Sequence, residues 1–267
     1  MAENNSGLFD NLKDLGFNDL NNISLYTNKD ENTKSNIRFV KKSSPADFVY
    51  ERKVVCPVCN KDIRIKSVKT SGIRVISRET DFMTIYDEPN PLFYDAWMCL
   101  RCGYTALSSK FNTITDKQIT LVKQNITSKW NCNKSYPTVY TVDNAIEAHQ
   151  MALLNTVTIQ AKDSDKAMIC LKLSWLYRIK HDEHGEKKFQ QHALLGFINA
   201  LENERFPVFG LDETSLEYLI GEIYRRLGDN SNALLWFSKV LGSREAKSRI
   251  KDMARNQKDT INKLQGT

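Results

Sequence analysis

The chain has 267 residues, 41% of them hydrophobic and 26% charged, a balance typical of a soluble globular protein large enough for two domains. It contains no run of about 18 uncharged apolar residues, and its first residues lack a basic stretch followed by an apolar one. We therefore expect no membrane helix, no membrane partner and no secretory signal, and a cytoplasmic location. The net charge of +6 is too small and too unevenly spread to indicate nucleic-acid binding by itself.

The first part of the sequence predicts a leader followed by a small β module. Residues 1–44 are rich in Asn, Asp, Ser and Lys and predict a disordered segment, because they have too few apolar side chains to form a core. Alternating or β-branched residues then predict four strands, over 52–56, 62–69, 73–76 and 93–98. The expected β module covers residues 45–110.

Two Cys-x-x-Cys pairs are the strongest chemical signal: Cys56, Cys59, Cys99 and Cys102. In each pair a tight turn can direct both sulfurs to one point, and two pairs together predict tetrahedral sulfur coordination of zinc or of a rubredoxin-like iron. The residues after the pairs are Asn60 and Gly103, which tolerate the left-handed backbone that such a turn needs. Since four thiolates leave no open position, we expect a structural ion.

The sequence gives little support for chemistry other than metal binding. The insert of residues 60–98 is longer than the about 15–20 residues of a usual zinc ribbon, so it must fold as a β excursion that returns. A redox role for the first pair is disfavoured because it lacks a strand-to-helix setting. Cys170 and His149 fall on predicted helix faces and indicate core packing, whereas Cys132 has no assigned role. No metalloprotease, phosphate-loop or nucleophile-elbow motif argues for an enzyme.

From residue 111 the hydrophobic period becomes helical and predicts an all-α domain over 111–267. A short helix contains Ile119 and Trp130, and six more follow at 143–161, 165–180, 186–204, 213–227, 231–241 and 244–264. The predicted N-caps are Ser164, Asp212 and Ser243, and the predicted C-caps are Gly228 and Gly242. Short helices joined by short loops are expected to pack as antiparallel hairpins.

One of these hairpins matches the tetratricopeptide pattern through Gly221, Tyr224, Gly228, Ala233 and Phe237. Small residues in that pattern stand where two helices cross closely, and aromatic residues fill the space beside them. Similar spacing recurs in an earlier hairpin, and about two and a half repeats are expected, with the last helix closing the stack. The alternative is a generic helical bundle. The predicted fold class is α+β: a zinc-ribbon-like β module followed by tetratricopeptide-like helices.

Six stretches of the sequence resemble a bacterial family called domain of unknown function 2225. They are Val55-Cys-Pro-Val-Cys59 and residues 73–81, 90–94, 99–104, 173–178 and 218–228. The resemblance covers about residues 48–260 and implies a zinc-ribbon-like head and a helical repeat tail, without supplying an activity. Family members often have a further cysteine after the position of Asp81. Because Phe82 and Met83 stand there, no fifth ligand is expected.

The stretch from Arg74 to Asp81 places Arg74, Arg78, Glu79 and Asp81 next to the predicted metal module. Three interpretations remain open at this point. The charges form an ion-pair network that fixes the insert, or they form an anion or partner site in which arginine gives bidentate contacts, or one carboxylate is catalytic.

The leading functional hypothesis is a cytoplasmic zinc-bound adaptor that holds a protein or peptide in a helical groove. The groove would be lined by exposed side chains of two first helices: Lys172, Trp175 and Arg178, then Glu222, Arg225 and Arg226. Their basic character favours an acidic peptide, and exposed charges are expected to contribute little to folding. One alternative is nucleic-acid binding by the basic cluster at 61–78 with Phe93, Tyr94 and Trp97. Another is an enzyme that uses Arg78 and Asp81.

Overall fold

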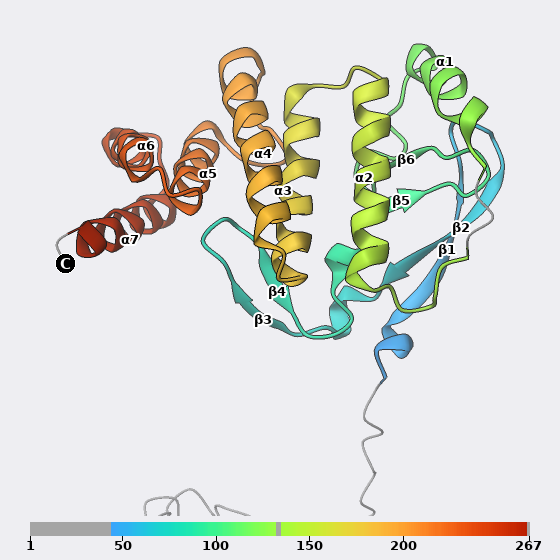
Figure 1. Cartoon of the computed structure of the whole chain (residues 1–267), viewed down its shortest axis with the longest axis horizontal. Coiled ribbons are helices and arrows are strands. Elements are labelled where there is room, and N and C mark those ends of the chain that lie inside the picture. The colour runs from blue at the N-terminus through green and yellow to red at the C-terminus, as the bar shows by residue number, and fades with distance from the viewer. Residues whose placement is uncertain (1–43, 132–134, 266–267) are drawn as a thin grey trace, which may run out of the picture. The chain divides into compact units, whose positions relative to one another are not determined.

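The structure is a computed structural model that describes residues 44–131 and 135–265 (Figure 1). The leader predicted for residues 1–44, except Ser44, and Cys132 lie outside these ranges. Residues Ser43–Thr267 form one compact unit, so the β module and the helices are described together. Among the described residues, no helix combines the length and the apolar character that crossing a membrane requires.

Three separate antiparallel hairpins make up the first part of the unit. Their strands are β1 (Val49–Val55) with β2 (Asp62–Val68), β3 (Val75–Arg78) with β4 (Thr84–Tyr86), and β5 (Ala96–Met98) with β6 (Thr105–Leu107). The predicted strands at 52–56 and 62–69 are confirmed. The strand predicted from residue 93 begins three residues later, because residues 91–94 form a 3₁₀ turn in which the Asn90 side chain accepts a hydrogen bond from the Leu92 N–H. The 3₁₀ segments are η2 (Pro45–Phe48), η3 (Thr70–Gly72), η4 (Pro91–Tyr94) and η5 (Thr127–Lys129).

Seven helices follow in the described chain. They are α1 (Asp116–Asn125), α2 (Val142–Thr158), α3 (Asp163–Ile179), α4 (Glu183–Asn203), α5 (Glu213–Arg226), α6 (Asn230–Gly242) and α7 (Ser248–Gln265). Asp212 caps α5 as predicted, accepting a hydrogen bond from the Ser215 N–H at 2.9 Å. Gly228 has the predicted left-handed backbone, with φ of 88°.

Three predicted helix ends are wrong. Ser164 lies inside the first turn of α3, where its N–H and hydroxyl both bond the Glu204 carboxylate at the end of α4. Ser243 follows α6 as its C-cap, and α7 begins only at Ser248, after a non-helical connection that bends at residues 244–246. Gly242 is the last residue of α6 and does not have a positive φ. For the two serines the cause is a hydrogen bond that sequence spacing does not reveal, to Glu204 for Ser164 and from the Glu245 N–H for Ser243.

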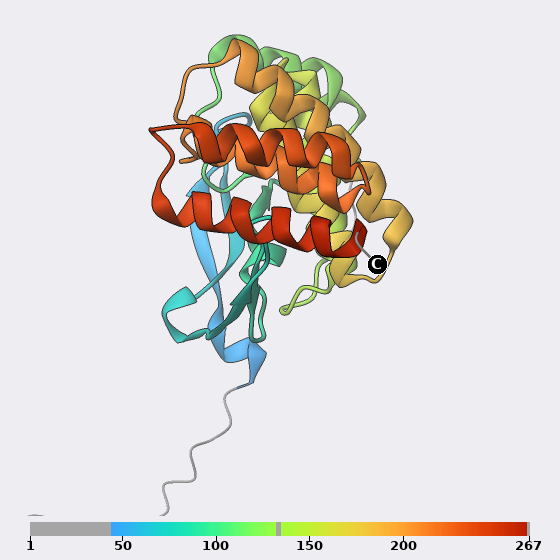
Figure 2. The same cartoon turned by 90° about the vertical axis from the view of Figure 1, so that its left-hand side faces the viewer.

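The helices pack as adjacent pairs, α3 with α4 and α5 with α6, and α7 lies against both helices of the second pair (Figure 2). A side chain added at Gly221 would place its Cβ 2.9 Å from the buried ring of Phe237. In the first pair, a Cβ at Gly196 would lie 2.8 Å from the Cβ of Ala167. Close helix crossings therefore explain why small residues stand at these positions.

The β hairpins and the helices share their core. Helix α2 lies across β5 and β6, and Met83, Leu92 and Leu107 from the β region pack in the same apolar cluster as the inner faces of α2 and α3 (Figure 1). The β3–β4 hairpin extends from this core along α3 and α5, with Phe82 packed at 5.5 Å, centroid to centroid, against Tyr218. The long insert between the cysteine pairs thus folds as a β excursion that returns, as predicted.

His149 on α2 is fully buried where these two parts meet, and one of its ring nitrogens lacks a partner. Its Nδ1 lies 2.8 Å from the carbonyl oxygen of Ala145 and so must donate to it, while Nε2 has no hydrogen-bond partner among the described residues. Burial lowers the pKa of His149 to about 4, although the nearby Asp95 carboxylate opposes the shift; the Lys172 ammonium adds to it. The histidine is therefore a neutral core residue near neutral pH.

This burial predicts a pH-dependent contribution to stability. Because the folded-state pKa lies below the ordinary value of 6.5, protons bind preferentially to the unfolded chain. The neutral His149 contributes fully to the free energy of unfolding above pH 6.5. As the pH falls from 6.5 to 4, the free energy of unfolding decreases by about 3 kcal/mol because of this one residue. We expect His149→Gln to flatten the wild-type slope of unfolding free energy across this window in denaturant titrations. His192→Gln, which removes an exposed histidine of α4, is the control, and an equal slope in His149→Gln and wild type would contradict the prediction.

Candidate metal centre and a buried charged network

The four cysteines of the two Cys-x-x-Cys pairs meet at one point. The sulfurs of Cys56 and Cys102 are 3.7 Å apart, those of Cys59 and Cys99 are 3.8 Å apart, and all four lie within 4.8 Å of one another. A tetrahedron with metal–sulfur bonds of about 2.3 Å has edges of about 3.8 Å, whereas a disulfide would need about 2.05 Å. The cluster can therefore hold one metal ion with all four sulfurs as ligands.

The local backbone explains why each pair directs its sulfurs inward. Each pair occupies the turn of a hairpin, between β1 and β2 or between β5 and β6. Asn60 and Gly103 have φ of 54° and 78°, the left-handed conformation that the sequence predicted. Their N–H groups donate to the carbonyl oxygens of Cys56 and Cys99, each at 2.8 Å, which closes the two turns. A Cβ at Gly103 would lie 2.8 Å from the ring of Trp130, so glycine is required there on both counts.

Helical segments support the second turn from outside. The Thr127 hydroxyl donates to the carbonyl oxygen of Cys102 at 2.9 Å, and the Trp130 indole donates to that of Leu100 at 2.9 Å. From α2, the Asn155 amide donates to the carbonyl oxygen of Gly103 at 3.1 Å. Sequence reasoning did not identify these supporting residues, because a polar side chain that bonds a backbone carbonyl carries no spacing signal.

Three of the four cysteines are buried, Cys59 is half-buried, and the ionisation of one thiol affects that of its neighbours. Cys56 and Cys99 have no exposed surface and Cys102 has 2%. Hydrogen bonds from the thiols of Cys102 and Cys56 lower the pKa of Cys99 to about 4, while hydrogen bonding to Cys56 and Cys99 raises the pKa of Cys102. Ionising one thiol thus opposes ionising another, and a cation is needed to hold all four as thiolates. The donor set is soft and complete, which suits zinc or iron in a closed site.

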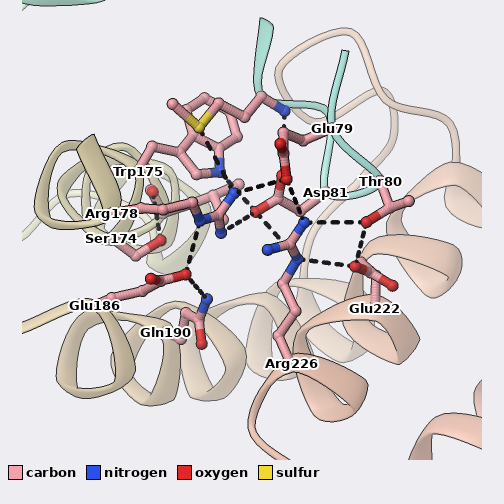
Figure 3. Close-up of polar contacts among 12 residues, drawn as sticks. Glu79, Thr80, Asp81, Ser174, Trp175, Arg178, Glu186, Gln190, Glu222 and Arg226 are labelled. Atoms are coloured by element: carbon pink, nitrogen blue, oxygen red, sulfur yellow. Dashed lines mark hydrogen bonds and ion pairs between the residues drawn. The ribbon is translucent and has the colours of Figure 1, made fainter. Parts of the chain in front are cut away.

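A second polar cluster lies between the β3–β4 hairpin and three helices (Figure 3). We call it the buried charged network. The hairpin turn contributes Glu79, Thr80 and Asp81, α3 contributes Trp175 and Arg178, α4 contributes Glu186 and Gln190, and α5 contributes Glu222, Arg225 and Arg226.

Asp81 forms the hairpin side of the buried charged network and is fully buried. Its Oδ2 accepts hydrogen bonds from Arg178 Nη2 at 2.6 Å and Trp175 Nε1 at 3.0 Å, and its Oδ1 accepts one from the Met83 N–H at 3.3 Å. Burial alone would raise the pKa of Asp81. The hydrogen bond from Arg178 and the positive charges of Arg226 and Arg178 outweigh that effect and hold the pKa below its usual value. Asp81 is therefore an ionised, fully bonded carboxylate.

Glu222 forms the helical side and is also fully buried. Arg225 binds it with two nitrogens, at 2.8 and 2.7 Å, and Arg226 Nε binds it at 2.8 Å. Arg226 Nη2 then reaches Glu79 Oε2 at 2.8 Å, so one guanidinium joins α5 to the hairpin turn. Both buried carboxylates have their partners, which leaves neither free to act as a general base.

The residues that the sequence suggested for partner binding fall into two groups in the structure: some belong to the buried charged network and others lie outside it. Asp81, Trp175, Arg178, Arg225 and Arg226 all belong to the buried charged network. Lys172 instead pairs with Asp95 at 2.9 Å, and Arg74 and Arg78 form no ion pair within the described ranges.

The expectation that the groove side chains stand exposed is wrong. Trp175 retains 9% of its surface, the Arg178 side chain 19% and the Arg226 side chain 16%. The reason is that the acidic turn of the β3–β4 hairpin covers these faces of α3 and α5. The signal for this contact was present in the sequence, because an acidic turn and two arginine-bearing helices complement each other in charge.

One family model matches the part of the chain that contains both the cysteine cluster and the buried charged network. A model of the family described as "Uncharacterized protein conserved in bacteria (DUF2225)" matches residues 49–261. The chain belongs to this family. The DUF2225 match includes both cysteine pairs, the β3–β4 hairpin and all helices up to most of α7, and it confirms the resemblance found in the sequence. No curated protein and no solved structure matches the chain significantly.

Proposed function

We propose that this chain is a cytoplasmic adaptor whose β hairpins are fixed by one structural zinc ion and whose helical hairpins bind a protein or peptide. The observation that carries the proposal is the cluster of four sulfurs at tetrahedral spacing, three of them from buried cysteines. Four thiolates complete the coordination of zinc, so the ion would stabilise the fold and bind no substrate. The thiols of Cys56, Cys59, Cys99, Cys102 and Cys170 are all free, which suits a reducing compartment.

An enzymatic role has less support. The carboxylate that the sequence singled out, Asp81, already accepts three hydrogen bonds and has no exposed surface. A general base must lie within hydrogen-bond distance of the substrate proton that it removes, and a buried carboxylate such as Asp81 does not meet a substrate. The buried charged network is better suited to holding the β3–β4 hairpin against the helices, which is one of the interpretations that the sequence left open.

Nucleic-acid binding by the β module also has less support. Of the basic cluster, Lys66 donates to the carbonyl oxygens of Tyr136 and Pro137 at 2.8 and 2.6 Å, and Arg64 pairs with Glu51 at 3.2 Å. Of the three aromatic candidates, Trp97 and Tyr94 are 9% and 4% exposed and Phe93 is half-buried, whereas base stacking needs an accessible ring.

The experiment that tests the proposal combines metal analysis with partner isolation. Protein purified without chelators should contain about one zinc ion per chain by elemental analysis. The tagged chain, expressed in its native bacterium and cross-linked in the cell, should recover a reproducible protein partner identified by mass spectrometry. A visible thiolate-to-iron absorption band with iron in place of zinc would refute the zinc assignment, and the absence of any enriched partner would refute the adaptor.

A further inference from the structure

A cavity of about 340 Å³ lies between the β3–β4 hairpin and α7, beside the buried charged network. The hairpin contributes Arg78 to its lining, α5 contributes Tyr218, and α7 contributes Arg249, Asn256 and Gln257. The cavity is thus built from segments far apart in the sequence, and its polar lining combines two guanidinium groups, which only donate, with hydroxyls and amides that donate and accept.

The cavity carries uncompensated positive charge. Arg78 and Arg249 pair with no carboxylate within residues 44–131 and 135–265. Glu79 also lines the cavity, but its carboxylate is held by Arg226 at 2.8 Å. By contrast, Arg255 on the same helix has a carboxylate partner, Asp252, at 2.6 Å. Two exposed arginines therefore line one half-open pocket, and the only carboxylate among the described lining residues, that of Glu79, is bound by Arg226.

The adjoining surface already binds carboxylates through arginine. Immediately beside the cavity, the acidic turn of the chain itself is held by Arg178 and Arg226 from α3 and α5. Tyr218 connects the two places, since it lines the cavity and its hydroxyl donates to the carbonyl oxygen of Thr80 at 3.0 Å. An acidic segment of the chain itself occupies one part of this surface, and the pocket beside it presents the side chains of Arg78 and Arg249.

We propose that the cavity between Arg78 and Arg249 binds an acidic segment of a protein partner. The two guanidinium groups would bind aspartate or glutamate carboxylates, and the amides of Asn256 and Gln257 would bond the backbone of the segment. Phe82 and Met253 in the lining provide contact for one apolar side chain. A peptide fits better than a nucleic acid, because a small pocket with two arginines gives far fewer phosphate contacts than a basic stripe. This inference rests on the adaptor function proposed above.

The test is selection of random displayed peptides on the full-length, metal-loaded chain. We expect enrichment of Asp and Glu, and we expect Arg78→Ala with Arg249→Ala to weaken the enriched peptides about tenfold or more in fluorescence anisotropy. The matched control is Lys251→Ala with Lys258→Ala. Like the double arginine variant, this control removes two positive charges in total, but at 100° per residue Lys251 and Lys258 lie on the side of α7 opposite Arg249. The control should change the affinity less than about twofold, because the charge it removes is remote and screened.

Several outcomes would overturn the inference. They are selected peptides without acidic enrichment, no selected binder at all, equal weakening by both double variants, or a single-stranded oligonucleotide that binds more tightly and depends on Arg78 and Arg249. All four substituted side chains lack ion pairs among the described residues, so unchanged melting temperature and metal content will show that folding is intact. If the partner isolated from the bacterium binds the Arg78 and Arg249 variant normally, the adaptor function stands and only this site is wrong.

Discussion

Replacing Cys99 with serine is expected to abolish metal binding and to lower the free energy of unfolding by about 5 kcal/mol or more. Structural zinc contributes binding energy directly to folding, and the loss is large compared with a total stability of about 5–15 kcal/mol. Cys99 lies in the turn that Thr127, Trp130 and Asn155 support, so its loss also loosens the contacts of α1, η5 and α2 with the β module. Elemental analysis and hydrogen exchange followed by mass spectrometry measure both effects.

The expected pattern of exchange distinguishes a local from a global role of the metal. Residues 49–68 and 96–107 should lose protection first and α1 next, because Val122 and Ile126 of that region share the core of the cysteine cluster. Helices α5 to α7 should remain protected, since their own core lies elsewhere. Cys170→Ala is the control: this cysteine is buried in α3 outside the cluster and should leave one metal ion per chain. Full metal occupancy in Cys99→Ser would contradict the assignment of the ligands.

The metal centre could be predicted from the sequence because its chemistry is local. Two residues between paired cysteines fix a turn, and Asn60 and Gly103 supply the backbone conformation that the turn needs. The positions of the helices could also be predicted, since a 3.6-residue hydrophobic period persists along each helix. Helix ends were less predictable. Ser164 was a plausible cap by type, yet it bonds Glu204 at the far end of the next helix, a contact that only the folded chain creates.

The buried charged network was harder to predict because it joins distant segments. Glu79 and Asp81 were recognised as charged residues next to the metal module, and Arg178 and Arg226 as charges on first helices of hairpins. Nothing in their spacing shows that the turn of one hairpin covers the faces of α3 and α5. We expected these arginines to be exposed because the sequence analysis considered the helices alone, without the β3–β4 hairpin turn that covers them. Charge complementarity between separate segments is the kind of signal that could have suggested it.

Replacing Arg178 with methionine is expected to lower the free energy of unfolding by about 3–5 kcal/mol, which is the usual cost of removing one partner of a buried ion pair. Arg178 binds Asp81 at 2.6 Å and Glu186 at 2.8 Å. Without it, the buried Asp81 carboxylate keeps the hydrogen bonds from the Trp175 indole and the Met83 N–H, and its remaining cation is the more distant Arg226 at 3.6 Å. Methionine preserves much of the apolar volume of the arginine stem, so the loss reports mainly on the charge. Urea denaturation of the metal-loaded protein measures it.

The control is Arg255→Met, which removes an arginine from an exposed pair with Asp252 and should cost less than about 1 kcal/mol. A double-mutant cycle with Asp81→Asn then isolates the interaction between the two side chains. Asparagine keeps an oxygen for the Trp175 indole but carries no charge, so adding it to Arg178→Met should recover part of the lost stability, with a coupling energy of about 1–3 kcal/mol. If Arg178→Met costs no more than Arg255→Met, the buried charged network does not hold the β3–β4 hairpin against the helices, and another contact, such as the packing of Phe82 on Tyr218, must do so.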